Sequence, residues 1–368
     1  MATISAEERG ALRDSVRRLL ADHSAEADVR RAMETPAGYD AELWRKLAEM
    51  GIAGLVIEEG FGGAGAGPLE LELVMEEAGA ALLCSPLLAS GVLAAELLRA
   101  LGDEDAKTRL LPGIAAGTSI ATVALTGDQG VWTPEGVAVT ASQAEGVWRL
   151  DGEASYVIHG QNADVLLVAA NGGSEVFEVD PVSAGVAIAA LPTFDHTLRL
   201  ARIAFAGASG RRIEAAGPVW EAVQQALNLA LVGLAGEQAG GARRVLDFTV
   251  DYAKARIQFG RAIGSFQAIK HMASDLLLES ESAISAARNA ARALAEDAPD
   301  ADAAISLAAF ACADAFNLTT ATSIQMHGGI AFTWAHPAHL YLRRARADAQ
   351  LFGPPAFFRE RYIQQLGG

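Results

Sequence analysis

Apolar residues recur with a helical spacing along the first third of the chain. Positions three and four residues apart are apolar in four segments, which is the pattern of helices that bury one face. The segments are Ala6–Leu20, Tyr39–Met50, Glu70–Ala78 and Ser90–Leu101. The glycine-rich run Gly51–Gly67 lacks both the GxGxxG spacing and a surrounding βαβ unit, so we interpret it as a structural loop. Residues 1–118 are predicted to form an N-terminal α-helical domain.

The period then shortens from about 3.6 residues to two. Short alternating segments rich in β-branched residues are separated by Gly, Asp and Pro, as expected of strands joined by turns. They are Ile120–Leu125, Gly136–Thr140, Val147–Leu150, Val165–Ala169, Val176–Val179, Gly185–Ile188 and Arg199–Phe205. We expect a middle β domain, an antiparallel barrel or sandwich, over residues 119–217.

Helical spacing returns after Pro218 in four long segments. They are Pro218–Ile257, Phe266–Asp297, Ala301–Met326 and His336–Leu351. Long helices with short connections favour an antiparallel four-helix bundle. Residues 218–368 are predicted to form this C-terminal four-helix-bundle domain, which makes the chain an α+β protein that is mainly α.

Composition narrows the classes of function. The net charge of −16 argues against a nucleic-acid partner, because phosphates favour basic surfaces. No apolar run reaches the ~20 uncharged residues of a membrane span, and the N-terminal segment mixes acids and bases, unlike a signal peptide. We therefore expect no membrane span and a cytoplasmic protein in which Cys84 and Cys312 are free and buried.

Arg256 stands at the predicted C-terminal end of a long helix, which Phe259-Gly260 stops. A cation there complements the helix dipole. A guanidinium can also bind a pyrophosphate through two parallel hydrogen bonds. The spacing alone favours the first interpretation and leaves the second open.

A pair of glycines ends the next candidate motif, Gln325-Met-His327-Gly328-Gly329. Glycines in this position typically cap a helix because they accept positive φ, and they also allow a ligand to approach the backbone closely. His336 and His339 follow His327, but no carboxylate or cysteine accompanies them at ligand spacing. We therefore expect no metal site.

Both motifs resemble signatures of the acyl-CoA dehydrogenase family, and the resemblance extends from about residue 5 to residue 365. It implies the family's order of helical, β and helical domains, and FAD as the cofactor. It also implies that one group of residues contacts FAD held mainly by a neighbouring subunit. These are Arg256, Phe259, Gln267, Gln325, Gly328 and Gly329. Ala331 departs from the pattern, since the family has a third glycine there.

The segments with which the family binds the flavin ring inside one chain match less well. Thr126 keeps the threonine of the first segment and is the residue there that the resemblance assigns to FAD. In the second segment, Ile158 replaces a hydroxyl side chain that would bond the flavin. An isoleucine side chain neither donates nor accepts a hydrogen bond.

The two usual positions of the family's catalytic base are also changed. That base is a glutamate that removes an α-proton while a β-hydride passes to the flavin. The positions align with Ala230 and Phe352, which cannot take a proton. Glu237 lies ~10 Å beyond Ala230 at about 1.5 Å per residue, so we expect bundle contacts for it, and we expect Asp348 to offset nearby arginines. No catalytic residue is predicted.

The resemblance is strongest to the non-catalytic, β-type subunit of bacterial heteromeric acyl-CoA dehydrogenases. It implies an α2β2 complex with a homologous catalytic subunit, an acyl-CoA substrate that can be bulky, such as a steroid side-chain thioester, and an electron-transferring flavoprotein as acceptor. Two alternatives stay open. One is a self-sufficient homomeric dehydrogenase with an unrecognised base, for which Glu237 and Asp348 are the weak candidates. The other is a flavin-free scaffold or acyl-CoA-binding paralogue.

Overall fold

The computed structural model describes residues 4–367, which divide into two compact units. The first unit contains Arg31–Gly67 and Cys84–Ala230. The second contains residues 4–30, Pro68–Leu83 and the chain from Leu231 onward. Helix α7 (Val219–Ala255) passes from the first unit into the second.

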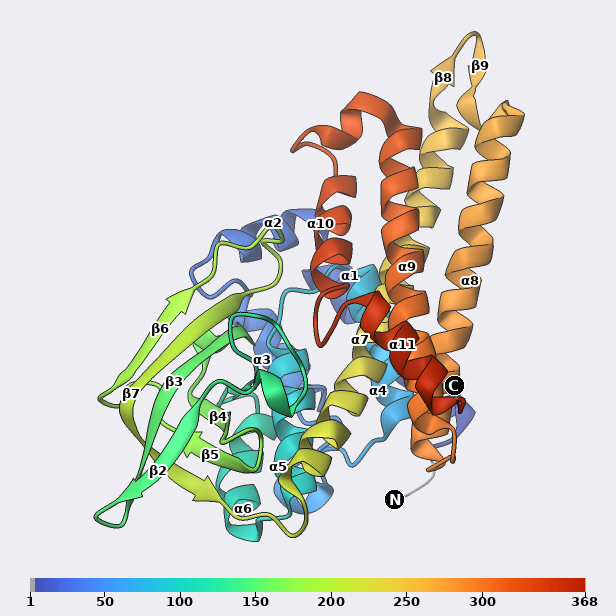
Figure 1. Ribbon diagram of the computed structural model, residues 1–368. Helices are drawn as coiled ribbons and strands as arrows, with labels where there is room; N and C mark the ends of the chain where they lie inside the picture. Colours follow the sequence, from blue (N-terminus) through green and yellow to red (C-terminus); the bar gives the residue numbers. More distant parts are fainter. Residues whose placement is uncertain (1–3, 368) are drawn as a thin grey trace. The chain divides into compact units, whose positions relative to one another are not determined.

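The first unit is built on a seven-stranded sheet (Figure 1). Its strands are β1 (Ala121–Ala124), β2 (Thr140–Ala144), β3 (Val147–Ile158), β4 (Val165–Ala170), β5 (Glu175–Val179), β6 (Val186–Ala190) and β7 (Leu200–Ile213). Their order is β1-β4-β5-β7-β3-β2, with β6 also paired to β7. Side chains such as Leu150, Phe177 and Ile203 alternate inward from these strands and form one apolar core.

Two details of the predicted β domain are wrong. The sheet is mixed rather than purely antiparallel, because β1 runs parallel to β4. The predicted strand Gly136–Thr140 is instead a 3-10 turn at Pro134–Gly136 followed by β2, which begins at Thr140. The N–H groups of Gly136 and Val137 donate to the Thr133 and Pro134 carbonyls within this turn, at 2.9 and 3.2 Å, and so do not donate to a strand ladder.

Helices and helical turns complete the first unit. They are α3 (Ala41–Glu49), a 3-10 turn at Glu59–Phe61, a π-helical segment at Leu87–Ala94, α5 (Ala95–Leu101) and α6 (Glu104–Ala115). Helix α6 was not predicted. Asp103 caps it by accepting from the Ala106 backbone N–H at 3.0 Å, and its exposed acidic first turn hides the apolar spacing of the short helix.

The second unit is a helical bundle that carries one small hairpin. Its elements are α1 (Ala6–His23), α4 (Pro68–Ala80), the later part of α7, β8 (Ile257–Gln258), β9 (Arg261–Ala262), α8 (Gln267–Ala295), α9 (Ala301–His327), α10 (Ala338–Asp348) and α11 (Pro355–Gln365). Helix α2 (Glu26–Glu34) begins in this unit. The predictions missed α2 and α11, which lie beside Ser, Thr or Pro-rich breaks that obscure a short apolar period.

Glycines allow α4 and α7 to cross at very short range within the second unit. A Cβ on Gly236 would lie 2.6 Å from the carbonyl oxygen of Glu72, and one on Gly240 would overlap the Glu76 carbonyl. Only residues without a side chain fit such a crossing. The crossing fixes the later part of α7, and therefore the end of the bundle that α7 reaches.

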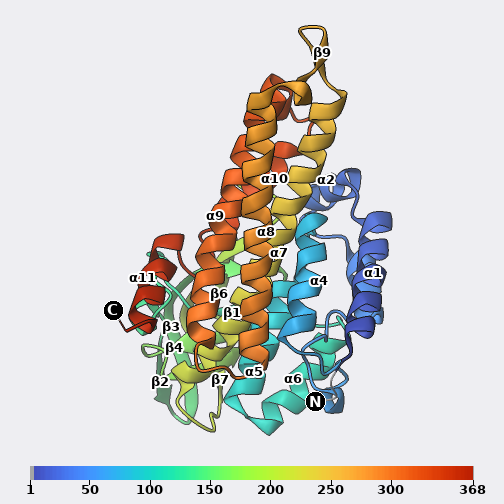
Figure 2. The same cartoon turned by 90° about the vertical axis from the view of Figure 1, so that its right-hand side faces the viewer.

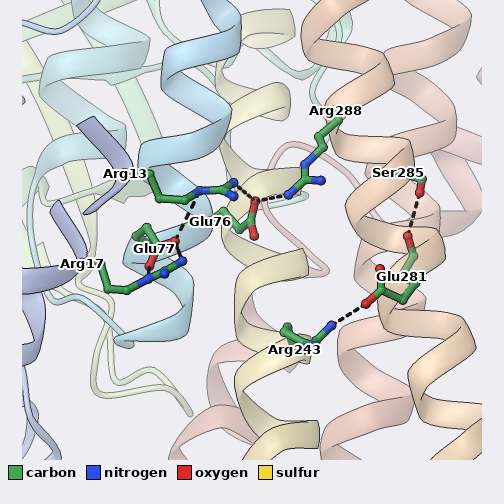
Figure 3. A network of polar contacts seen from close by, with 8 residues as sticks. All are labelled: Arg13, Arg17, Glu76, Glu77, Arg243, Glu281, Ser285 and Arg288. Atoms are coloured by element: carbon green, nitrogen blue, oxygen red, sulfur yellow. Dashed lines mark hydrogen bonds and ion pairs between the residues drawn. The ribbon is translucent and has the colours of Figure 1, made fainter. Parts of the chain in front are cut away.

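Charged side chains join the helices around α4 (Figure 3). Glu76 accepts from Arg13 of α1 at 2.7 Å and from Arg288 of α8 at 3.2 Å. Glu77 accepts from both Nε and Nη2 of Arg17, at 3.0 and 2.7 Å. Helix α4 is thereby tied to α1 and α8, which flank it in Figure 2.

Helix α9 is the apolar core of the second unit. It is the one helix among residues 4–367 that is long and apolar enough to cross a membrane by composition, and 67% of its apolar window is buried inside the protein. Cys312 lies on it, and Cys84 lies in the first unit; neither forms a disulfide and both are buried, as predicted. Burial raises the pKa of the Cys312 thiol, which makes it unreactive.

Candidate functional site

A two-residue hairpin follows α7 at one end of the bundle (Figure 1). Ile257 pairs with Ala262 and Gln258 with Arg261, which leaves Phe259 and Gly260 as the loop. Both loop residues have positive φ, +52° and +78°, as in the type I′ turn that suits a tight hairpin. The apolar side chain of Phe259 is 92% exposed. The hairpin therefore presents an uncovered aromatic ring.

Arg256 lies just before this hairpin with its backbone fixed and its side chain exposed. Its N–H donates to the Tyr252 carbonyl and its carbonyl accepts from Ile263 N–H, both at 2.8 Å. No ion pair within residues 4–367 involves its guanidinium. Gln267, the first residue of α8, is exposed as well. A guanidinium without a carboxylate partner is available to an anionic ligand.

The glycine pair lies where α9 ends. Gly328 has φ +70° and ψ −150°, a combination that only glycine adopts readily, and its N–H donates to the Ile324 carbonyl. A Cβ at Gly328 or Gly329 would meet nothing within 4 Å. Gln325, one turn earlier, is exposed. The backbone here is open to a ligand or a partner.

Packing brings the hairpin and the glycine pair to the same end of the bundle. The rings of Tyr252 and His327 lie 4.3 Å apart, and the Tyr252 hydroxyl donates to the His327 carbonyl at 3.4 Å. Leu246, Leu276 and Met326 of three different helices form one apolar cluster beneath them. The six residues that the sequence assigns to FAD on a neighbouring subunit are thus exposed on one surface, which we call the bundle end.

Three histidines stand beside the bundle end. His327 and His336 have ring centroids 4.5 Å apart, and His339 hydrogen-bonds to the His336 carbonyl at 2.7 Å. Burial lowers the pKa of all three imidazoles. Among the described residues, no group of three His, Cys, Asp or Glu is placed to hold a metal ion.

In the first unit, the two segments that align with the family's flavin-binding segments contact each other directly. The Thr126 hydroxyl donates to the Val131 carbonyl at 2.7 Å, and the Tyr156 hydroxyl donates to the Asp128 carbonyl at 3.0 Å. Tyr156 has φ +57° at a β-bulge between Ala154 and Val157. Such a backbone is strained for a side chain of this size. The hydroxyls of Thr126 and Tyr156 are therefore already used within the chain.

Ile158 has no polar group to offer. Its side chain is buried, and its carbonyl accepts from the Thr122 hydroxyl at 2.6 Å. Neither base position carries an acid: Ala230 is fully buried in the first unit, and Phe352, in the second, is buried with φ +61°. Asp348 is also buried and lines a cavity of about 10 Å³ in the second unit.

Glu237 forms a buried ion pair with Arg344 of α10. Arg344 also donates to the Leu83 carbonyl at 3.3 Å. This is the bundle contact that we expected for Glu237. Sequence reasoning missed Arg344 as its partner, because the two residues are 107 positions apart and only the packing of α10 on α7 joins them.

The bundle end and the segments of the first unit therefore differ in how well they fit FAD, the cofactor that the family resemblance implies. At the bundle end, an exposed guanidinium, an exposed aromatic ring and an open glycine backbone fit a pyrophosphate and its ring system. In the first unit, the hydroxyls of Thr126 and Tyr156 are already bonded to carbonyls of the chain, and Ile158 is buried and apolar. These side chains do not fit the polar edge of a flavin.

Comparisons with known proteins agree with the resemblance over most of the chain. The model of the acyl-CoA dehydrogenase N-terminal domain matches residues 6–118, and that of the C-terminal domain matches residues 220–366. Acyl-CoA dehydrogenase IpdE2 of Mycobacterium tuberculosis is 38% identical over 356 residues, covering 95% of this chain and 94% of that protein. Its namesake from Mycolicibacterium smegmatis is 37% identical over 352 residues, covering 95% and 96%.

Solved structures are similar at comparable coverage. One is the ChsE4–ChsE5 complex from Mycobacterium tuberculosis, with a TM-score of 0.90, 29% identity, and 100% of this chain and 99% of that chain covered. A variant of the steroid ACAD Tcur3481–Tcur3483 has a TM-score of 0.88 and 28% identity, with 98% of each chain covered.

Proposed function

This chain belongs to the acyl-CoA dehydrogenase family, and on that premise we propose that it is the non-catalytic subunit of a heteromeric acyl-CoA dehydrogenase. In this role the bundle end completes the FAD site of a homologous catalytic subunit, within an α2β2 complex. The observation that carries the proposal is the exposure of Arg256, Phe259 and the Gly328-Gly329 backbone on one surface, with no ion pair to the guanidinium among residues 4–367.

The absence of a base supports the non-catalytic role. Removing the α-proton of a thioester needs a positioned acceptor, and Ala230 and Phe352 have none. The carboxylate of Glu237 is held by Arg344. Bound FAD supplies the hydride acceptor of the reaction. This chain's own residues bind and position: Arg256 neutralises a pyrophosphate, and Phe259 covers an apolar part of the cofactor.

The names of similar proteins guide the proposed substrate. One solved relative is described as a steroid ACAD, and another is a complex of two different chains. We extend both features to this chain as a proposal: a bulky acyl-CoA such as a steroid side-chain thioester, oxidised by a complex of unlike subunits. An electron-transferring flavoprotein would accept the electrons.

Flavin content tests the subunit role. The chain is purified alone and together with a homologous catalytic subunit that retains its glutamate, and FAD is quantified by absorbance near ~450 nm, where oxidised flavins absorb. We expect about one FAD per heterodimer and little or none on the isolated chain. Full occupancy and turnover of the isolated chain would replace the proposal with a homomeric dehydrogenase. A complex without flavin would favour a scaffold.

Arg256→Ala should release FAD from the assembled complex. Loss of a charge-assisted pair costs about 1.5–3 kcal/mol, or roughly tenfold to a hundredfold in FAD affinity. Lys254→Ala is the matched control, because this neighbouring cation is exposed and is paired with Asp251. FAD affinity is measured by flavin fluorescence during dilution; equal retention by the two variants would remove Arg256 from the site.

A further inference from the structure

A pocket of about 520 Å³ lies within the second unit, between α1, α2, α4, α7 and α10. Its volume is within the ~300–1,000 Å³ of small-molecule sites. None of the residues assigned above to FAD, and neither base position, lines it. The bundle-end chemistry therefore leaves this pocket unexplained.

The walls of the pocket are mainly apolar. Leu20 of α1, Val29 of α2 and Leu340 of α10 are buried side chains that face it, and Phe248 of α7 adds an aromatic surface. The Phe248 and Tyr341 rings pack with centroids 5.7 Å apart. Such walls favour a ligand with an apolar body, because its burial removes apolar surface from water.

Most polar groups around the pocket have partners inside the protein. Arg17 is bound by both carboxylate oxygens of Glu77, and Glu26 pairs with Arg30 at 2.7 Å. The Tyr341 hydroxyl donates to the Ala80 carbonyl at 2.8 Å. Burial raises the pKa of Tyr341 to about 12, so this phenol stays neutral.

Arg244 is the exception among the charged lining residues. Its side chain is exposed at the pocket and interacts with the Tyr341 hydroxyl. No ion pair between described residues involves it. Its neighbour Arg243, in contrast, pairs with Glu281 (Figure 3). Arg243 also pairs with Asp247 and does not line the pocket. One cation at the edge of an apolar pocket favours one negative charge on the ligand.

We infer that this pocket binds an apolar carboxylic acid, with the apolar body between α1, α4 and α10 and the carboxylate on Arg244. A dianion such as a phosphate monoester suits the site less well, because Glu77 and Glu26 lie on the same lining and would repel the second charge. The chemistry is shared by fatty acids and by fused-ring acids, and the pocket itself admits either class by volume.

Calorimetric titration of the full chain tests the inference with two probes, dodecanoate and cholate. Binding of either acid supports it, and the tighter one identifies whether a flexible chain or a fused-ring body fits. Dodecanol is the uncharged control and should bind at least about tenfold more weakly than dodecanoate. Equal binding of the alcohol and the acid, or no binding of either acid at millimolar concentration, would overturn the inference.

Two variants and one matched control locate the site. Arg244→Gln should weaken binding of the better acid about tenfold or more, because the carboxylate loses its cation. Arg243→Gln removes the same charge one residue away and should leave affinity within about twofold. Ala25→Trp places an indole at the pocket mouth, where Ala25 is exposed, and should abolish binding. Unchanged affinity in both Arg244→Gln and Ala25→Trp would place any bound acid elsewhere.

Discussion

The polar side chains of the bundle end and those of the flavin-like segments in the first unit differ in whether they are bonded within the chain. At the bundle end, Arg256 is exposed, it has no ion pair with any residue that the structure describes, and the glycine backbone is open. In the first unit, the hydroxyls of Thr126 and Tyr156 donate to carbonyls of their own chain. Groups that would reach a neighbour's cofactor stay available, while groups that would hold the chain's own cofactor are used internally.

This difference gives a criterion, the burial and pairing of a charged group, that distinguishes a residue that contributes to binding from one that contributes to stability. A buried charge that has a partner, such as Glu237 with Arg344, contributes to a folded core. An exposed charge without a partner contributes little to folding. The following changes test that distinction, beginning with the largest expected effect.

Arg344→Met should lower the free energy of unfolding by about 3–5 kcal/mol, because it leaves the buried Glu237 carboxylate without its cation. Urea unfolding followed by circular dichroism measures the loss. Adding Glu237→Leu to the same chain should recover most of it, since two apolar groups then replace the pair. A double variant as unstable as the single one would mean that Arg344 acts through other contacts.

The same ion pair bears on catalysis. Glu237→Gln in the assembled complex should leave kcat nearly unchanged once the folded fraction is corrected for, since its carboxylate is committed to Arg344. A collapse of kcat with normal FAD content would make Glu237 a base and would break the contrast between the two regions.

Glu72 is a buried carboxyl that departs from the pattern of satisfied charges. It lies on α4, and its Oε1 has no hydrogen-bond partner in the part of the chain that the structure describes. Burial, aided by Glu76, raises its pKa to about 7. The folded state therefore keeps a proton that the unfolded chain releases near pH 4.5, and stability falls as the pH rises from there through 7.

Glu72→Gln should remove this pH dependence and raise stability above pH 7 by about 1–3 kcal/mol. Urea unfolding at pH 5 and pH 8 measures the difference, with the exposed Glu279→Gln as control. If the variant gains nothing at pH 8, or if the complex loses turnover with it, Glu72 is either solvated or functional rather than an unsatisfied core acid.

Ile158→Thr restores the hydroxyl that the family pattern has at this position. We expect a loss of about 1–2 kcal/mol of stability from burying an unpaired hydroxyl. We expect no FAD on the isolated chain, because Thr126 and Tyr156 stay committed. Ile158→Val is the control that keeps the branched shape without the hydroxyl. Flavin absorbance on purified Ile158→Thr alone would show that one substitution reopens the site.

The histidines beside the bundle end should produce the smallest effect, at acidic pH. Burial lowers the pKa of His327, His336 and His339, so the unfolded chain binds more protons than the folded chain just below pH 6.5. Stability is full above that pH and falls as the pH drops further. Glu26 opposes this effect at His336 and His339, and Arg30 and Arg343 reinforce it at His339.

The loss of stability should appear as a lower melting temperature at pH 5 than at pH 7. His336→Gln should reduce this difference in melting temperature. Because His327 directly precedes Gly328 and its ring contacts that of His336, FAD retention by the complex should decline over the same range. A pH profile identical in wild type and His336→Gln would exclude the histidines as its cause.

Much of the fold followed from the sequence because its signals are local. The periods of 3.6 and two located α1, α7, α8, α9 and most strands. The motif around Arg256 predicted a helix end and a turn, and the structure has both there. Short helices or helices flanked by polar residues, such as α2, α6 and α11, were not predicted, because a few apolar positions are too few to show a period.

The sequence by itself determined which side chains could take a proton or bind an anion, because that property belongs to each residue. It therefore excluded Ala230 and Phe352 as bases and identified Arg256 as an anion-binding candidate. Only the tertiary structure decided which of those groups were already satisfied. Pairing depends on partners that are far away in sequence. Arg344 forms an ion pair with Glu237, which is 107 positions away, whereas no residue within 4–367 forms an ion pair with Arg256 or Arg244. Whether a charged side chain can bind a ligand therefore depends on tertiary packing, which brings together residues that are distant in the sequence.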